Sequence, residues 1–292
     1  MSRGCLVGCV VSLWMVLVCG VARAQPLPYR HESCSDDGVL CLVTEQPDTE
    51  SVSFTLRARI QSALTVTLAA EVENVEASTP LPVTVVFEGS ETRTVLKLKR
   101  LRRELAWSYK NVRYTSNWGT PRAVHDDSVL YQLPVASGRP VRVVQGYDGA
   151  FSHNGPSRYA VDFDLPEGSP VHAARAGVVV QAIQHFTEAG TDESYQKRDM
   201  GNRVLVRHSD GTLGYYGHLK PGAVVVKEGQ YVHPGQLLGL SGNTGFSRGP
   251  HLHFEVRKPI DGNQVRTLPV RFKTEQGVGV PLEKDKHFTA VR

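Results

Sequence analysis

Polar and apolar residues alternate strictly along several short segments of this chain. In SVSFTLRARI, residues 51–60, every second residue is apolar, and serine, threonine and arginine stand between them. The segments 64–72 and 92–100 repeat this alternation. A period of two is typical of a β-strand with one buried face. Because no long stretch of helical periodicity occurs between residues 45 and 115, we predict a small antiparallel β-sandwich there.

The pattern loosens between Asn117 and Pro140, where turn-forming residues are frequent, so we place a domain junction near 120–140. From Val141 onward the β pattern returns. The stretch GNRVLVRHSDGTLGYYGHL has two apolar runs on either side of Asp210-Gly211, which predicts a β-hairpin. After about Thr274 the pattern fades, and we expect a C-terminal tail. The pattern as a whole therefore predicts an all-β protein.

The first residues have the layout of a secretory signal peptide. Arg3 gives a positive start, the 18 residues from Cys5 to Ala22 carry no charge, and Ala22-Arg23-Ala24 is a small-x-small cleavage site. We expect cleavage before Gln25 and export to the periplasm or the extracellular side of the cell envelope. An uncleaved membrane anchor is the alternative, since such a stretch is just long enough to span a bilayer.

Charge and cysteine content narrow the class of protein. The net charge of +4 falls to +2 when Arg3 and Arg23 leave with the signal, which is too mild to indicate a nucleic-acid or anionic-membrane partner. Three of the five cysteines lie in the predicted signal. The remaining pair, Cys34 and Cys41, predicts a disulfide that closes a small loop, with two free thiols as the alternative.

Two histidines stand one residue apart in GPHLHFEV, residues 249–256. Side chains two apart on a strand point to the same face, so His251 and His253 direct both imidazoles at one spot. For an isolated pair, ordinary exposed polar side chains are the simpler explanation. A catalytic zinc site needs three protein ligands and an open position. Further candidates occur upstream, in the order His153, Asp162 and His218.

This ordered set resembles the lysostaphin-like (M23 family) zinc metallopeptidases, which cleave cross-bridges or stem peptides of peptidoglycan. The resemblance covers about residues 148–258, including EGSPVHAARAGVVV, GNRVLVRHSDGTLGYYGHL and VKEGQYVHPGQLLGLSGNTGFSRGPHLHFEV. It implies a Zn²⁺ ion held by His153, Asp162 and His253, with His218 and His251 at the catalytic positions and His251 as general base. Two histidines and one carboxylate leave a fourth position for water, whose pKa the metal lowers towards about 7.

One departure from the family pattern concerns the first ligand. The family usually spaces its first histidine and its aspartate as His-x-x-x-Asp, whereas the residue four before Asp162 is Arg158, which cannot bind zinc. Either the domain has lost its metal, or the intervening loop is longer and His153 still reaches the site. We favour the longer loop, because Gly155 and Pro156 allow a turn.

Two further residues near this set have open roles. Asp164 is two residues from Asp162, and the shared face makes it a candidate outer partner of the metal site. Tyr216 either hydrogen-bonds in the cleft or packs in the core.

The expected function is therefore that of a zinc-dependent endopeptidase that hydrolyses peptide bonds in peptidoglycan stem peptides or cross-links. The alternative is a catalytically inactive lysostaphin-like domain that binds or activates cell-wall hydrolases, and a structural envelope protein is a second alternative. Peptidoglycan is the expected partner, a cell-envelope protein is a further candidate partner, and no nucleic acid is expected. The predicted organisation is a signal peptide at 1–24, a β-sandwich-like binding or positioning domain at 25–135, a lysostaphin-like antiparallel β-sheet peptidase domain at 136–275 and a C-terminal tail at 276–292.

Overall fold

The structure is a computed structural model that describes residues 27–198 and 200–291. The predicted signal peptide at 1–24 lies outside the described residues. Nearly all regular elements are strands; the described residues include one α-helix, α1 (Glu193–Arg198), and one 3-10 turn, η1 (Gly155–Ser157). The predicted all-β class is therefore confirmed. None of the described helices has the length and apolar character needed to cross a membrane.

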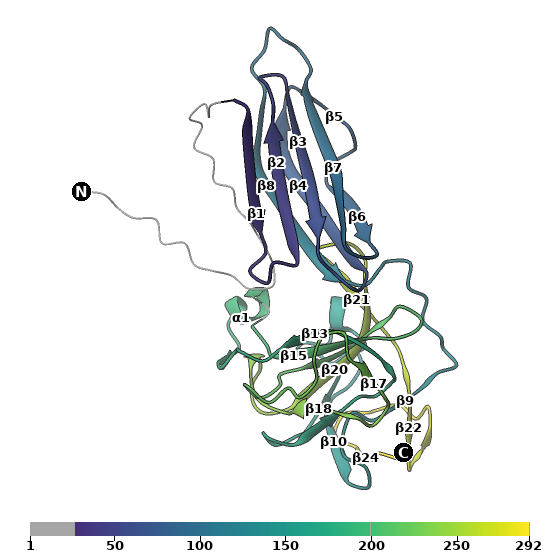
Figure 1. Ribbon diagram of the computed structural model, residues 1–292. Coiled ribbons are helices and arrows are strands. Elements are labelled where there is room, and N and C mark those ends of the chain that lie inside the picture. The colour runs from purple at the N-terminus through teal and green to yellow at the C-terminus, as the bar shows by residue number, and fades with distance from the viewer. Residues whose placement is uncertain (1–26, 199, 292) are drawn as a thin grey trace, which may run out of the picture.

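The N-terminal part consists of two antiparallel sheets that stand side by side (Figure 1). The larger has the order β1-β2-β3-β7-β5 and the smaller the order β6-β4-β8. Their strands are β1 (Tyr29–Cys34), β2 (Leu40–Gln46), β3 (Ser51–Ala58), β4 (Leu64–Glu73), β5 (Val75–Ala77), β6 (Val83–Phe87), β7 (Glu91–Arg100) and β8 (Ser108–Trp118). The three strands expected from alternation are thus present as β3, β4 and β7.

One buried cluster joins these two sheets. Buried and half-buried residues alternate along β3, as its sequence predicts. Phe54 and Leu56 of β3 belong to the same buried cluster as Val66 of β4 and Tyr114 of β8. Burying each such large side chain contributes about 1.5–3 kcal/mol, so this cluster holds the sandwich together.

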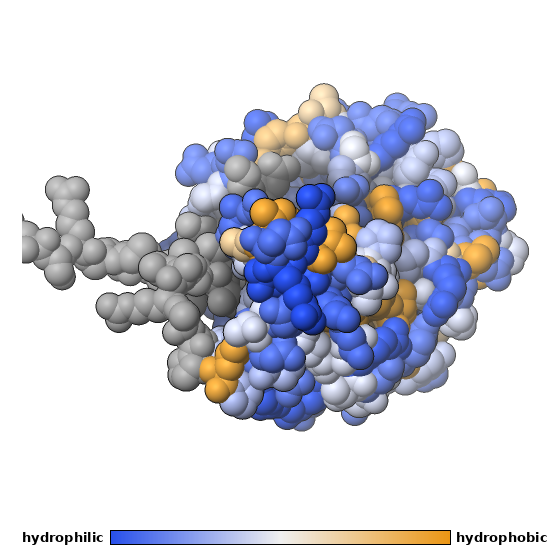
Figure 2. Space-filling view, turned by 90° about the horizontal axis from the view of Figure 1, so that it is seen from above, coloured by the Kyte–Doolittle hydropathy of each residue, from blue (hydrophilic) through white to orange (hydrophobic). Residues whose placement is uncertain are grey.

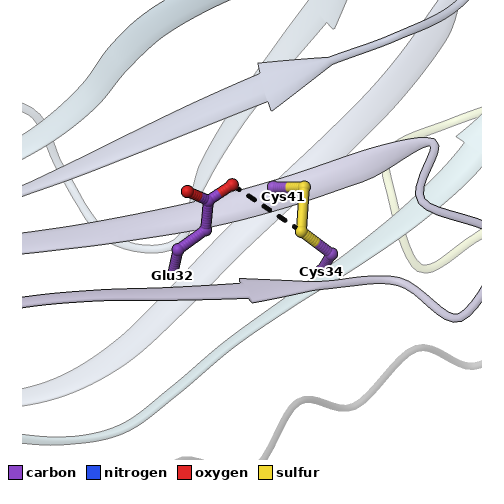
Figure 3. Close-up of side chains that lie close together, drawn as sticks. All are labelled: Glu32, Cys34 and Cys41. Atoms are coloured by element: carbon purple, nitrogen blue, oxygen red, sulfur yellow. Dashed lines mark hydrogen bonds between the residues drawn. A yellow bond between two sulfur atoms is a disulfide. The ribbon is translucent and has the colours of Figure 1, made fainter.

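The predicted disulfide between Cys34 and Cys41 is present (Figure 3). The two residues are paired across the β1–β2 hairpin, next to its turn. Glu32 lies beside them, and the three residues together resemble a metal-binding group. Because the two sulfur atoms bond to each other, neither is available as the thiolate that binds a metal.

The C-terminal part is built on one antiparallel sheet with the order β17-β13-β15-β16-β20-β11-β10-β24, with β21 added beside β20. Its strands are β10 (Pro140–Gln145), β11 (Val161–Phe163), β13 (Gly177–Ile183), β15 (Arg203–Arg207), β16 (Leu213–Gly217), β17 (Tyr231–Val232), β20 (Leu252–Pro259), β21 (Val265–Leu268) and β24 (His287–Thr289). The predicted hairpin is confirmed as β15–β16, and Gly211 in its turn has a φ of +82°.

Three small sheets complete this part. They pair β12 (Pro170–His172) with β18 (Leu237–Leu240), β14 (Ala189–Gly190) with β19 (Gly245–Phe246), and β9 (Leu130–Gln132) with β22 (Arg271–Thr274) and β23 (Gly277–Val278). Residues 276–292, which the sequence sets apart as a tail, provide β23 and β24. Phe288 of β24 is 4% exposed and belongs to the core of the C-terminal part, because β24 pairs with β10.

The turn between β20 and β21 joins the two parts. Gly262 N donates to Thr67 Oγ1 of β4 at 2.8 Å, and Asn117 Nδ2 of β8 donates to the carbonyl of Asp261 at 3.1 Å. Figure 1 shows β21 directly below the lower end of the N-terminal sheets. The opposite end of these sheets, seen from above in Figure 2, is mostly hydrophilic with scattered hydrophobic residues. The sandwich thus contacts the C-terminal part through the end of β4 and β8 that faces the β20–β21 turn.

Candidate active site

Three neighbouring strands of the large sheet bring the candidate residues together. In the register of the sheet, His253 on β20 lies opposite Asp162 on β11 and opposite Gly217 at the end of β16. His218 follows Gly217 directly. His251 immediately precedes β20, two residues from His253. Pairing in the sheet therefore gathers side chains that are up to 91 residues apart in the chain.

His153, Asp162 and His253 form a compact group. Their potential ligand atoms all lie within 4.8 Å of one another. His253 Nδ1 lies 2.9 Å from Asp162 Oδ1, and His153 Nε2 lies 3.2 Å from the same oxygen. His153 is fully buried and Asp162 is 6% exposed. The structure thus brings together the three residues that the resemblance implies as metal ligands.

The loop before β11 places His153 in this group despite its unusual spacing. The His153 backbone N–H donates to the carbonyl of Gly149 at 3.0 Å, and its Nδ1 donates to the carbonyl of Gly146 at 2.8 Å. Arg158 is exposed and forms an ion pair with Asp148, with Nε 2.6 Å from Oδ1. Arg158 therefore does not occupy the place of the first histidine.

His218 and His251 extend the group into a cluster of four rings. The ring centroids of His218 and His251 are 4.5 Å apart, and those of His218 and His253 are 5.8 Å apart. His218 has a φ of +61°, in the left-handed region that non-glycine residues rarely adopt. Two hydrogen bonds fix the next residue, since Leu219 N donates to the carbonyl of Asn202 and Asn202 Nδ2 donates to the carbonyl of Leu219.

Backbone carbonyls determine the tautomers of three of these histidines. His153 Nδ1 faces the carbonyl of Gly146, His218 Nδ1 that of Thr244 at 2.7 Å, and His251 Nδ1 that of Gly249 at 2.8 Å. A carbonyl only accepts, so each Nδ1 carries its hydrogen. In the neutral rings, Nε2 therefore presents a lone pair. For His251, that lone pair lies on the side of Asp162, with Nε2 3.8 Å from Oδ1.

Glu255 is a partner of the site that the sequence analysis missed. His253 Nε2 lies 3.2 Å from Glu255 Oε2, and Arg257 Nη1 lies 3.2 Å from Glu255 Oε1. Glu255 is 2% exposed. The alternation that relates His251 to His253 continues to Glu255 and Arg257 along β20, so the signal was present in the sequence.

The structure also assigns the roles of Asp164 and Tyr216, which the sequence left open. Asp164 is not a partner of the site, because β11 ends at Phe163 and the Asp164 carboxylate pairs with Arg142, 2.9 Å away. Tyr216 belongs to the core, where its fully buried hydroxyl accepts a hydrogen bond from the backbone N–H of Ala174 at 2.8 Å. Its neighbour Tyr215 lines the cleft, as does Tyr195.

The electrostatics of the site favour a cation between the three candidate ligands. Burial alone raises the pKa of Asp162, but the neighbouring His153 and His253 outweigh burial and hold that pKa well below its usual range. Burial lowers the pKa of His253, but Asp162 and Glu255 outweigh it and raise the pKa to about 10. Burial and the nearby His251 and His253 lower the pKa of His218 to about 3, so His218 is neutral at physiological pH.

The donor set fits a zinc ion. His153 Nε2 faces a carboxylate oxygen, and this buried nitrogen has no well-directed hydrogen bond within the described residues. Two acceptors at this distance repel each other unless a proton or a metal ion stands between them. Two imidazoles and one carboxylate are a usual set for catalytic zinc. A histidine that turns its other nitrogen to a buried carboxylate, as His253 does to Glu255, is also typical of zinc sites.

The site opens to a cleft of about 550 Å³. Asp162, His218, His251 and His253 form part of its wall, together with side chains from the loops before η1 and after β19. The cluster is therefore reachable from solvent, although Asp162 itself is almost fully buried.

Comparison with known proteins gives one family. Residues 156–267 match peptidase family M23, so the matched stretch begins three residues after His153. Peptidoglycan DD-endopeptidase ShyA of Vibrio cholerae is 40% identical over 140 residues, which are 48% of this chain and 27% of ShyA. Glycyl-glycine endopeptidase ALE-1 of Staphylococcus capitis is 35% identical over 127 residues, which are 43% of this chain and 32% of ALE-1.

Among solved structures, the catalytic domain of lysostaphin from Staphylococcus simulans is 28% identical and has a TM-score of 0.31. The match covers 44% of this chain and 87% of that domain. The chain spans less than a third of the length of the curated relatives named above. Residues 156–267, less than half of this chain, are thus similar to peptidase family M23.

Proposed function

We propose that this protein is a zinc-dependent endopeptidase that hydrolyses peptide bonds in peptidoglycan. The observation that supports it best is the group of His153, Asp162 and His253 beside a cleft whose wall includes Asp162, His253, His218 and His251. The names of the relatives, which include a peptidoglycan DD-endopeptidase, support the same substrate. In this proposal the three grouped residues bind the metal, and His218 and His251 act on the reacting groups.

Zinc, when bound, supplies Lewis-acid chemistry that polarises a carbonyl and lowers the pKa of water towards about 7. His251 is the proposed general base, because its Nε2 lone pair faces the metal group while Gly249 holds its Nδ1–H. Once protonated, His251 is stabilised by the Asp162 carboxylate, 3.8 Å away. It then returns this proton to the amine that leaves when the peptide bond breaks.

His218 has a different role in this proposal. Its Nδ1–H is engaged by Thr244 and its pKa is lowered to about 3, so its Nε2 accepts a hydrogen bond but does not donate one at neutral pH. It therefore orients the attacking water by accepting one of its hydrogens. His251 takes the proton, because burial and two neighbouring histidines disfavour a charge on His218.

Digestion of purified peptidoglycan, with and without a chelator, tests this proposal when zinc is measured in the same samples. We expect about one zinc per chain in the wild type, release of peptide fragments identified by mass, and loss of release with the chelator. His253→Ala removes a metal ligand, so we expect it to lose zinc and cleavage together. His251→Ala removes only the base, so we expect it to keep zinc and lose cleavage by about 10²–10⁴-fold.

His31→Ala is the matched control, since His31 is an exposed histidine on β1 in the N-terminal part. We expect it to keep zinc and full cleavage. A wild type that binds no zinc and releases no fragments would contradict the proposal and favour an inactive domain that binds or activates other hydrolases.

A further inference from the structure

The relatives differ in the bond that their names describe. One is a DD-endopeptidase and another a glycyl-glycine endopeptidase, at 40% and 35% identity, so similarity does not choose between these substrates. Peptidoglycan stem peptides carry free carboxylates, whereas a glycine bridge has no charged side chain. The charge of the cleft can therefore discriminate between the two classes of substrate.

We propose that Arg248 binds a free carboxylate of the substrate, and that the cleft therefore takes stem-type peptides in preference to glycine bridges. This inference rests on the proposed peptidoglycan endopeptidase function and assigns its substrate class. Arg248 lies in the loop between β19 and β20 and lines the same cleft as His251 and His253.

The charged side chains that line the cleft leave an excess of positive charge. Its two carboxylates already have partners, since Asp162 belongs to the proposed metal group and Glu255 pairs with Arg257. The other two cationic residues of the cleft wall are Arg248 and Lys284. Within the described residues, neither has a carboxylate in ion-pair distance. An anionic group of the substrate is the natural counter-charge.

Aromatic stacking holds the Arg248 guanidinium in place at the cleft. Its Cζ lies 3.5 Å from the centroid of the Phe151 ring. Phe151 in turn stacks on Phe246 of β19, with centroids 5.5 Å apart and an interplanar angle of 15°. A stacked guanidinium keeps its N–H groups free in its own plane, where it can bind a carboxylate through two parallel hydrogen bonds. In the part of the chain that the structure describes, no aromatic ring lies against Lys284.

The same loop couples Arg248 to the proposed base. Ser247 Oγ donates to the carbonyl of Gly249 at 2.8 Å, and that carbonyl also accepts from His251 Nδ1. Arg248 thus stands between two residues that are fixed relative to the His251 ring. The Cα atoms of Arg248 and His251 are at most about 10 Å apart, and both side chains line the same cleft, so the bound carboxylate belongs to a substrate residue near the bond that is cut.

The test uses three substrates: a cross-linked stem-peptide dimer, the same dimer with its carboxyl groups converted to carboxamides, and pentaglycine. We expect the wild type to cleave the untreated dimer with a kcat/KM about tenfold or more above that of the amidated dimer, as for loss of a charge-assisted bidentate contact. Pentaglycine is expected to remain uncut. This comparison needs no variant, so it stays informative whatever a substitution does to folding.

The variant Arg248→Gln should remove the preference by raising KM for the untreated dimer about tenfold, with kcat and zinc content unchanged. Arg248→Lys keeps the charge but not the paired hydrogen bonds, so it should retain part of the preference. Arg139→Gln, at an exposed arginine outside the cleft wall, is the control for total charge and should keep all of it.

Two results would overturn the inference alone. One is a wild type that cleaves the amidated dimer or pentaglycine as well as the untreated dimer. The other is a Lys284→Gln variant that loses as much preference as Arg248→Gln, which would indicate a diffuse positive field without a specific contact. Failure of the wild type to cleave all three substrates and whole peptidoglycan would instead overturn the proposed function, and this inference with it.

Discussion

At the scale of single residues, the hydrogen-bond partner of each imidazole determines which ring nitrogen carries a hydrogen and how strongly the ring attracts a cation. A backbone carbonyl engages Nδ1 of His153, His218 and His251, whereas His253 places its two nitrogens between the carboxylates of Asp162 and Glu255. His253 is therefore the histidine whose affinity for a cation depends most on a neighbouring charge. Glu255 provides that charge from a buried position on the same strand.

We predict that Glu255→Gln weakens zinc binding about 10–100-fold, the usual cost of losing a partner behind a metal-binding histidine. The amide oxygen still accepts the Nε2–H hydrogen bond, so the ring stays in place while the charge behind it is lost. Competition with a zinc indicator measures this affinity without any substrate. Glu275→Gln, at an exposed glutamate, is the matched control. Equal zinc affinity of the two variants would show that the Glu255 charge does not support the metal.

Strand periodicity is local, so the sequence alone placed His251 and His253 on one face, whereas the set of His153, Asp162 and His218 was implied by the family resemblance. Alternation placed His251 beside His253, and the same rule extended by two residues leads to Glu255. The rule fails for Asp164, because its strand ends one residue earlier. The contact between His153 and Asp162 depends on backbone hydrogen bonds of a loop, which no periodic pattern encodes.

At the scale of elements, the disulfide supports an edge strand. Among the described strands, β1 lies at the end of its sheet beside β2, and Cys34 and Cys41 tie the two strands at their turn. Ser35 Oγ donates to Asp37 Oδ1 at 2.6 Å and accepts from Leu40 N at 3.0 Å, so the turn has further support of its own.

We predict that the double variant Cys34→Ser, Cys41→Ser lowers the free energy of unfolding by about 2 kcal/mol, since the loop that is closed is short. Hydrogen exchange should become faster in β1 and remain unchanged in β4, which pairs with β6 and β8 on its two sides. Denaturant unfolding and exchange measured by mass spectrometry check both points. Unchanged exchange in β1 would mean that the hydrogen bonds of the turn hold this strand unaided.

Three long strands were predicted from alternation, whereas the 11-residue β8 and the shortest strands were not. β3, β4 and β7 have clear alternation over 8–10 residues. β14 and β19 have two residues each and pair in parallel across a separation of more than fifty residues. Only tertiary contacts define such strands, so a local pattern has nothing to detect.

At the scale of the whole molecule, one strand connects the site with the N-terminal part. β20 has His253 and Glu255 near its start, and Lys258 near its end donates from Nζ to the carbonyl of Pro121 at 2.9 Å. The turn that follows β20 contacts β4 and β8, where Thr115 Oγ1 donates to Asn263 Oδ1 at 2.8 Å. The sequence predicted two β domains and a junction between them, but this contact joins residues 148 apart and has no local signature.

The closest approach in this contact is at Gly262, which is buried against β4 and β8. A Cβ atom added there would overlap with the backbone nitrogen of Thr67 and the backbone oxygen of Thr115, neither of which is the movable end of a side chain. We predict that Gly262→Ala separates the turn from the sandwich and destabilises the protein by about 1–3 kcal/mol, as overpacking usually does. Zinc content should stay that of the wild type, because the site residues lie at the other end of β20. Hydrogen exchange should become faster in residues 115–117 and 260–264.

Gly89→Ala is the matched control, since a Cβ at Gly89 meets no atom within 4 Å. If the two variants exchange and unfold alike, the two parts are not held together by this turn, and the contacts of Lys258 and Arg207 with the N-terminal part become the interface to test.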